Sequence, residues 1–285
     1  MAHTGTLDVK PLSQHIGAEV RGLDLSADLD KATINALNEL WLEHLVLLFR
    51  DQKLSQEDQL SVTEAFGEPG PLGRPREFFP KGYENLLDKI MLVSNIRENG
   101  EPIGALPDGE MMFHHDMLHA EVPHKGTFLY AVEIPDHGGN TLFASGYAAY
   151  DTLPEEVREP LEGRRAFHHY HYGSTIKGDG RGTSAFSDSH HPVFRTHDDT
   201  GRKAVYVNRL MTEGIVDMEE EVSAPLLEAV YDHAEKPEFV YEHVWQVGDL
   251  ILWDNRCSMH ARTDFPEDQR RLMLRTTVKG DRAPV

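Results

Sequence analysis

The spacing of apolar residues along the chain predicts many short strands separated by a few helices. Alternating or continuous apolar runs predict strands at residues 7–12, 17–22, 45–49, 89–95, 127–134, 141–144, 239–245, 249–253 and 270–278, with a hairpin formed by 192–196 and 203–207. Apolar positions three and four apart predict helices at residues 28–44, 147–161 and 218–234. Ser55 followed by Asp58 has the spacing of a capping box, which predicts a further helix that Gly67 ends.

Short strands with a few helices outside them predict an antiparallel β sandwich or barrel with peripheral helices. The chain has no internal repeat and no Pro/Ser-rich linker, so we expect a single domain over residues 1–285. Residues 67–82 and 98–110 are rich in Gly and Pro, and they predict long loops that cover an active site. Residues 170–191 are polar, and they predict an irregular excursion.

Composition narrows the classes of partner. The chain has 285 residues, with 28 basic against 48 acidic side chains and a net charge of −20, which argues against binding to nucleic acid or to an anionic membrane surface. No apolar run approaches the length of a membrane span, and the N-terminus lacks the pattern of a signal peptide. The single cysteine, Cys257, fits a reducing compartment, so we expect a cytoplasmic protein.

The candidate chemistry begins at residues 113–116, Phe-His-His-Asp. Residues two apart on a strand point to the same face, so His114 and Asp116 can present an imidazole and a carboxylate to one point. They would be two of the three ligands of a 2-His-1-carboxylate iron site, with His115 on the opposite face. Alone, the motif is weak evidence for a metal site, and it favours a solvated turn. His260, just past the strand at 249–253, is the best candidate for the third ligand, and its competitor His243 fits a structural role.

A second feature lies in the last predicted strand. Arg271, Met273 and Arg275 share one face of it, and two arginines beside a methionine are costly to bury unpaired. One interpretation is a solvated edge. The other is a clamp for a carboxylate, because the planar guanidinium matches a carboxylate with two parallel hydrogen bonds. The residue pattern leaves both open.

A series of different short motifs extends along nearly the whole chain. They lie at residues 11–12, 16–25, 48–52, 66–67, 113–116, 138–141, 191–197 and 253–256, followed by His260, Arg271 and Arg275. In this order and spacing, the sequence resembles the Fe(II)/2-oxoglutarate-dependent dioxygenases of the taurine dioxygenase and 2,4-dichlorophenoxyacetate dioxygenase family. The resemblance implies a double-stranded β-helix (jelly-roll) core. It also implies Fe(II), 2-oxoglutarate as co-substrate and O₂.

The resemblance assigns roles residue by residue. It implies that His114, Asp116 and His260 are the iron ligands. Thr141, in the Gly-Gly-x-Thr turn, and Arg271, eleven residues past His260, match the groups that hold the C5 carboxylate of 2-oxoglutarate. Arg275 matches an arginine that contacts the acidic group of the substrate or the co-substrate, and Trp245 and Trp253 match aromatic residues that line the site. The remaining candidates for the substrate pocket are Asn95, Met117, Arg209 and Met211.

The resemblance implies a dioxygenase that hydroxylates, or oxidatively cleaves, a small anionic organic substrate with release of succinate and CO₂. Phe113 replaces the usual Trp, and residues 68–76 lack the histidine that helps the taurine enzyme hold its sulfonate, which argues against taurine as the substrate. By analogy we expect a homo-oligomer. Two alternatives stay open: a jelly-roll metalloenzyme that uses the same triad without 2-oxoglutarate, and a non-catalytic β module that binds small molecules.

Overall fold

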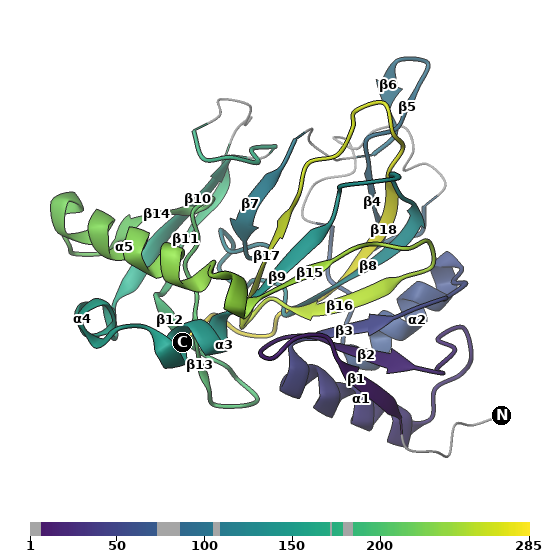
Figure 1. The fold of residues 1–285 in the computed structure, drawn as a ribbon, viewed down its shortest axis with the longest axis horizontal. Helices are drawn as coiled ribbons and strands as arrows, with labels where there is room; N and C mark the ends of the chain where they lie inside the picture. The colour runs from purple at the N-terminus through teal and green to yellow at the C-terminus, as the bar shows by residue number, and fades with distance from the viewer. Residues whose placement is uncertain (1–6, 73–85, 105–108, 172, 179–184) are drawn as a thin grey trace.

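The computed structural model describes residues 7–72, 86–104, 109–171, 173–178 and 185–285, and within them the chain is mainly β (Figure 1). A seven-stranded sheet and a four-stranded sheet form the centre of the molecule. Apolar residues of both sheets pack together between them, among them Phe143, Trp253 and Met273. Side chains that reach into this layer from either sheet are therefore the candidates for a buried site.

The larger sheet has the order β1-β2-β3-β16-β8-β18-β4, so segments from both ends of the chain meet in it. Strands β2 and β3 are parallel, and the other neighbours are antiparallel. The strands are β1 (Asp8–Pro11), β2 (Ala18–Arg21), β3 (Val46–Phe49), β4 (Met91–Ser94), β8 (Gly126–Glu133), β16 (Leu250–Asp254) and β18 (Leu272–Val278). The β8–β18 register places Thr127 opposite Thr277 and Leu129 opposite Arg275.

The smaller sheet has the order β15-β9-β17-β7, formed by β15 (Val240–His243), β9 (Thr141–Ser145), β17 (Ser258–Arg262) and β7 (Met111–His114). His260 lies opposite His114 on one side and opposite Phe143 on the other, while Arg262 lies opposite Thr141. Strand alternation turns His260 and Arg262 to the face opposite that of Met259, which packs in an outer cluster. His260 and Arg262 therefore point into the layer between the sheets.

Helices α1 (Lys31–His44) and α2 (Gln56–Phe66) cover the outer face of the larger sheet (Figure 1). Their apolar sides pack there through Leu37, Trp41, Val62 and Phe66. The predicted capping box is confirmed: the Ser55 side chain accepts from the backbone of Asp58, and the Asp58 side chain accepts from the backbone of Ser55. Gly67 ends the helix at a φ of 145°, a conformation that glycine adopts at low cost.

A second group of elements packs against the outer face of the smaller sheet, around Ala144 and Met259. It comprises the three-stranded sheet β11-β10-β14, the hairpin β12–β13 and several helices. The bounds are α3 (Gly146–Thr152), α4 (Glu155–Arg158), η3 (Glu159–Leu161), β10 (Arg165–His171), β11 (Ala185–Pro192), β12 (Phe194–Thr196), β13 (Lys203–Val205), β14 (Thr212–Ile215), α5 (Glu220–Ala234) and η4 (Pro237–Phe239).

Two sequence predictions in this group hold only in part. Residues 147–161 are helical as predicted, and a helix begins after Pro154, but they form three short segments because Leu153 and Pro154 take extended conformations. Proline has no N–H to donate and disfavours a helical residue before it. The two ends of 170–191 are not irregular, because 170–171 belong to β10 and 185–191 to β11, which pair antiparallel. Residues 173–178 between them are turns and bends, and 172 and 179–184 lie outside the described residues.

The structure describes only parts of the two loops that we expect to cover the site. Residues 98–110 contain a short hairpin of β5 (Arg97–Glu98) and β6 (Glu101–Pro102), while 105–108 and 73–85 lie outside the described residues. A cover over the site therefore stays a prediction. Within the described ranges, no helix is long and apolar enough to cross a membrane.

Candidate metal centre

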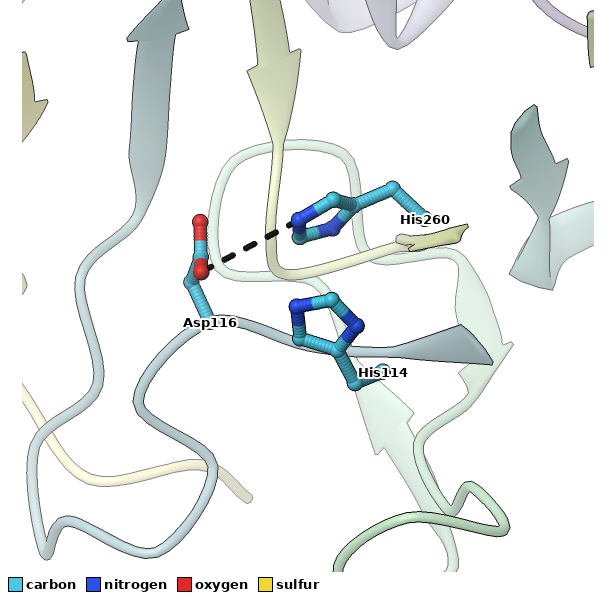
Figure 2. Close-up of side chains that lie close together, drawn as sticks. All are labelled: His114, Asp116 and His260. Atoms are coloured by element: carbon cyan, nitrogen blue, oxygen red, sulfur yellow. Dashed lines mark ion pairs between the residues drawn. The ribbon is translucent and has the colours of Figure 1, made fainter. Parts of the chain in front are cut away.

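His114, Asp116 and His260 converge at one point between the sheets (Figure 2). One ligand atom from each lies within 4.8 Å of the others, the spacing of a group that can hold a metal ion. His114 is the last residue of β7, and His260 lies opposite it on β17, with 4.1 Å between the ring centroids. The sheet register therefore brings together two histidines that are far apart in the sequence.

Two details differ from the sequence prediction. Strand β7 ends at His114, so Asp116 lies in a turn rather than on the same strand face, and Met117 after it has a φ of 60°. The carboxylate still lies within reach of the two histidines from this turn. His260 lies within strand β17, not just past a strand.

The protonation states suit a divalent cation. The Nδ1 of His114 lies 2.9 Å from the Met112 carbonyl oxygen, so Nδ1–H donates there and Nε2 keeps a lone pair for a metal. Burial lowers the pKa of both His114 and His260, which keeps the imidazoles neutral. Burial by itself would raise the pKa of Asp116, but Arg275 and the two histidines hold it well below its usual range. Two neutral imidazoles and one carboxylate fit Fe(II).

Arg275 is paired with the same carboxylate. Its Nη2 lies 2.8 Å from Asp116 Oδ1, the oxygen that faces His260 Nε2 at 4.0 Å. The structure thus excludes a solvated edge for Arg275, whose guanidinium points to the metal cluster.

Arg271 is buried without a matching carboxylate among the described residues. It is 2% exposed, and its Nε has no hydrogen-bond partner there. Burial lowers the pKa of Arg271 to about 9, and the charge of Arg262 adds to the effect. The side chain packs on the turn before β9, where a Cβ on Gly139 would lie 3.4 Å from Arg271 Nε. A buried arginine without a carboxylate partner is suited to bind an anionic ligand. The burial of Arg271 also argues against the solvated-edge interpretation.

Thr141 lies at the same end of the site. Its buried hydroxyl accepts a hydrogen bond of 3.0 Å from Trp245 Nε1, so Trp245 orients Thr141. Across β9–β17 Thr141 faces Arg262, while Phe143 faces His260. Two residues along a strand span about 7 Å, so Thr141 and Arg262 lie roughly that far from the metal ligands.

Sequence reasoning missed Arg262 and Thr127. Arg262 is buried two residues past His260 on β17, and strand alternation was the pattern that could have found it. Thr127 donates a hydrogen bond of 2.7 Å to Asp116 Oδ2 from strand β8. No local motif indicates that contact.

The other predicted pocket residues have different surroundings. Asn95 accepts from the backbone N–H of Arg271 and donates to the Gln269 carbonyl, so it supports the Arg271 backbone. Met211 is buried in a cluster with Leu118 and Tyr206, and Met117 adjoins Asp116.

Arg209 does not fit the predicted substrate role. Its guanidinium pairs with the acidic side of α5, at Glu228, Asp232 and Glu235. All three guanidinium nitrogens of Arg209 are therefore engaged with these carboxylates rather than with the metal cluster.

Two histidines that we did not expect to be ligands have other partners. His115 Nδ1 bonds to Asn208, and His115 is not in the metal-binding group. His243 Nε2 pairs with the buried carboxylate of Asp249 at 2.9 Å, a structural contact.

A second group with metal-like spacing, His197, Asp254 and Cys257, has its charge already compensated. Arg256 donates to both carboxylate oxygens of Asp254, and His197 Nε2 lies 3.1 Å from one of them. This group is a buried ion-pair network rather than a metal site.

Two imidazoles and a carboxylate inside a β sandwich, beside buried arginines, define the class of mononuclear 2-His-1-carboxylate oxygenases. The family described as "Taurine catabolism dioxygenase TauD, TfdA family" matches residues 8–277, and the chain belongs to it. The predicted jelly-roll core and enzyme class are confirmed.

Individual relatives match over nearly their whole length. The (S)-phenoxypropionate/alpha-ketoglutarate-dioxygenase of Sphingobium herbicidovorans is 32% identical, covering 97% of this chain and 96% of the relative. Pentalenolactone F synthase of Streptomyces arenae is 34% identical, covering 94% and 93%. The crystal structure of AAD-2 in complex with Mn(II) and N-oxalylglycine superposes with a TM-score of 0.81 at 28% identity, covering 99% of this chain and all of that one.

Proposed function

We propose that this chain is an Fe(II)- and 2-oxoglutarate-dependent dioxygenase that hydroxylates, or oxidatively cleaves, a small organic acid. His114, Asp116 and His260 would hold the iron, and their convergence within 4.8 Å is the observation that carries the proposal. When bound, Fe(II) with 2-oxoglutarate and O₂ supplies the oxidation of a C–H bond, with release of succinate and CO₂. The protein supplies position, charge and exclusion of water.

The co-substrate seat is supported by charge and distance. Arg271 is a buried cation that needs an anion, and Thr141 offers a hydroxyl already oriented by Trp245. Arg262, opposite Thr141, adds a second guanidinium to the same end of the layer. The distance from these groups to the candidate metal ligands is about the length of a short dicarboxylate. They are therefore suited to bind the C5 carboxylate of 2-oxoglutarate. Such a seat has no use in a jelly-roll metalloenzyme that works without a 2-oxo acid.

The substrate assignment rests on Arg275. Its guanidinium lies at the metal cluster but is compensated by a carboxylate that would also serve the iron. An acidic substrate group could take over part of this pairing, with Met117 beside it and Met211 and Asn95 farther out. Relatives named for (S)-phenoxypropionate and for sulfate esters support a small organic acid. We further propose a cytoplasmic, single-domain homo-oligomer that binds neither nucleic acid nor membrane.

A substrate panel tests this proposal. The iron-loaded protein is incubated with 2-oxoglutarate, O₂ and members of a panel of aryloxyalkanoates, alkyl sulfate esters and neutral analogues, and succinate release is measured. We expect succinate release to increase with one class of anion and not with its neutral analogue. In Arg275→Gln, the KM for that substrate should rise more than the KM for the co-substrate. Product formation without succinate would support the alternative metalloenzyme.

A further inference from the structure

A directed chain of hydrogen bonds ends on the candidate metal ligand Asp116. Trp253 Nε1 donates to Asn255 Oδ1 at 2.9 Å, and Asn255 Nδ2 donates to Thr127 Oγ1 at 2.9 Å. Thr127 Oγ1 donates to Asp116 Oδ2 at 2.7 Å. Asn255 and Thr127 are fully buried, and Trp253 is nearly so.

The chemistry of the groups fixes the direction of this chain. An indole N–H can only donate, so the Asn255 oxygen faces Trp253 and its NH₂ group faces Thr127. Thr127 accepts from that NH₂ and has its single hydroxyl hydrogen left for Asp116. A buried carboxylate oxygen that receives such a hydrogen bond is held in one orientation.

The remaining carboxylate oxygen has a different environment. Asp116 Oδ1 faces His260 Nε2 and Arg275, while Oδ2 faces Thr127 on strand β8 of the larger sheet. Asp116 lies in a turn, not on a strand, so no backbone ladder fixes its side chain. The hydrogen-bond chain orients the Asp116 side chain, whereas the strand register positions the two histidines.

We propose that Thr127, held by Asn255 and Trp253, is a positioning residue that makes Asp116 a one-oxygen ligand. The inference rests on the proposed function, since it requires Asp116 to bind the metal. With Oδ2 engaged by Thr127, only Oδ1, which faces His260, would be left to bind the metal. A second carboxylate oxygen on the metal would occupy a position that the 2-oxo acid or O₂ requires.

The test replaces the hydroxyl and keeps the shape. Thr127→Val removes the donor at nearly constant volume, and Thr127→Ser keeps the donor. Thr277→Val is the matched control, because Thr277 lies opposite Thr127 in the β8–β18 register and no described hydrogen bond joins it to Asp116. Mn(II) affinity is measured without 2-oxoglutarate, and the visible charge-transfer band is recorded anaerobically with Fe(II) and 2-oxoglutarate.

We expect Thr127→Val to weaken Mn(II) binding by about 10- to 100-fold, the usual effect of losing a partner of a metal ligand, and to shift the band. Thr127→Ser and Thr277→Val should stay near wild type, and the thermal midpoint of metal-free Thr127→Ser should be unchanged. Wild-type affinity and band in a folded Thr127→Val variant would overturn the inference, as would equal weakening in Thr277→Val. Asp116→Ala separates the two proposals: wild-type Mn(II) binding in that variant would contradict the proposed metal site itself.

Discussion

At the scale of single residues, the candidate site contains buried arginines that are not all paired with a carboxylate. Asp116 is paired with Arg275, but no described carboxylate pairs with Arg271, although it is almost completely buried. Burying a lone cation costs several kcal/mol unless a ligand compensates it. An incoming dicarboxylate removes this penalty, which makes Arg271 a determinant of co-substrate affinity.

This predicts a selective effect of Arg271→Lys. A point charge replaces a two-pronged donor, so the co-substrate KM should rise by roughly 10- to 100-fold while the KM for the organic substrate changes little. Steady-state kinetics measure both constants. Arg270→Lys is the neighbouring control, because Arg270 is exposed and pairs with Glu133, and it should leave both constants unchanged. Equal increases in both constants for Arg271→Lys would reassign the residue.

Residue identities were predictable only where a motif or a family pattern carried them. The three candidate ligands and Arg271 lie in such motifs, and the structure places the candidate ligand atoms within 4.8 Å of one another. Arg262 could have been found by strand alternation from His260, whereas Thr127 contacts Asp116 from a different strand and no local pattern indicates that contact. The acidic partners of Arg209 have helical spacing at Glu228, Asp232 and Glu235, but only the fold brings Arg209 next to them, so the sequence did not indicate these pairs.

At the scale of elements, the spacing of apolar residues predicted most of the helices and strands. The strands of the seven-stranded sheet, β9 and β15 of the smaller sheet, and helices α1, α2 and α5 begin and end close to the expected residues. Strand β17 lies outside the predicted strands, and β7 ends before Asp116. The irregular interpretation of 170–191 failed at its two ends, where β10 and β11 pair through their backbones, because polar side chains do not oppose that pairing. The helical segment at 147–161 is interrupted at Leu153, the residue before Pro154, and a new helix begins after that proline.

The capping box of α2 gives a prediction at this scale. Ser55→Ala removes the side chain that accepts from the Asp58 backbone, and it should lower the free energy of unfolding by about 1 kcal/mol. Urea denaturation followed by circular dichroism measures the change. Ser61→Ala, at an exposed position inside the same helix, should be neutral or slightly stabilising. A loss as large in Ser61→Ala would show that the cap is not the cause.

At the scale of the whole molecule, a buried ion-pair network joins the outer elements to the central sandwich. Arg256, just after β16, donates to Asp254 and reaches Asp199 in the loop between β12 and β13. His197 from the same loop contacts Asp254 as well. Burial would raise the pKa of Asp254, but Arg256 and His197 hold it below the usual carboxyl range.

Removing Arg256 should therefore destabilise the protein in a pH-dependent way. Arg256→Met leaves the Asp254 charge buried without its main partner, at a cost of about 3–5 kcal/mol near neutral pH. Because the folded-state pKa of Asp254 is depressed in the wild type, the stabilisation is present above the unfolded carboxyl pKa and is lost as pH falls through the folded one. The gap between variant and wild type should thus narrow in acid. Denaturation at several pH values measures it, and a constant gap would contradict this account.

Arg282→Met is the control for this comparison. Arg282 pairs with Asp281 at an exposed position, and such pairs contribute little. We expect its free energy of unfolding to match the wild type at every pH tested.

The central claim is that His114, Asp116 and His260 hold an iron that also binds 2-oxoglutarate. Anaerobic titration with Fe(II) and then with 2-oxoglutarate, followed by visible absorption, tests it most directly. We predict a weak charge-transfer band that appears only when both are present and is absent from Asp116→Ala. Iron binding without such a band, or an unchanged band in Asp116→Ala, would contradict the assignment.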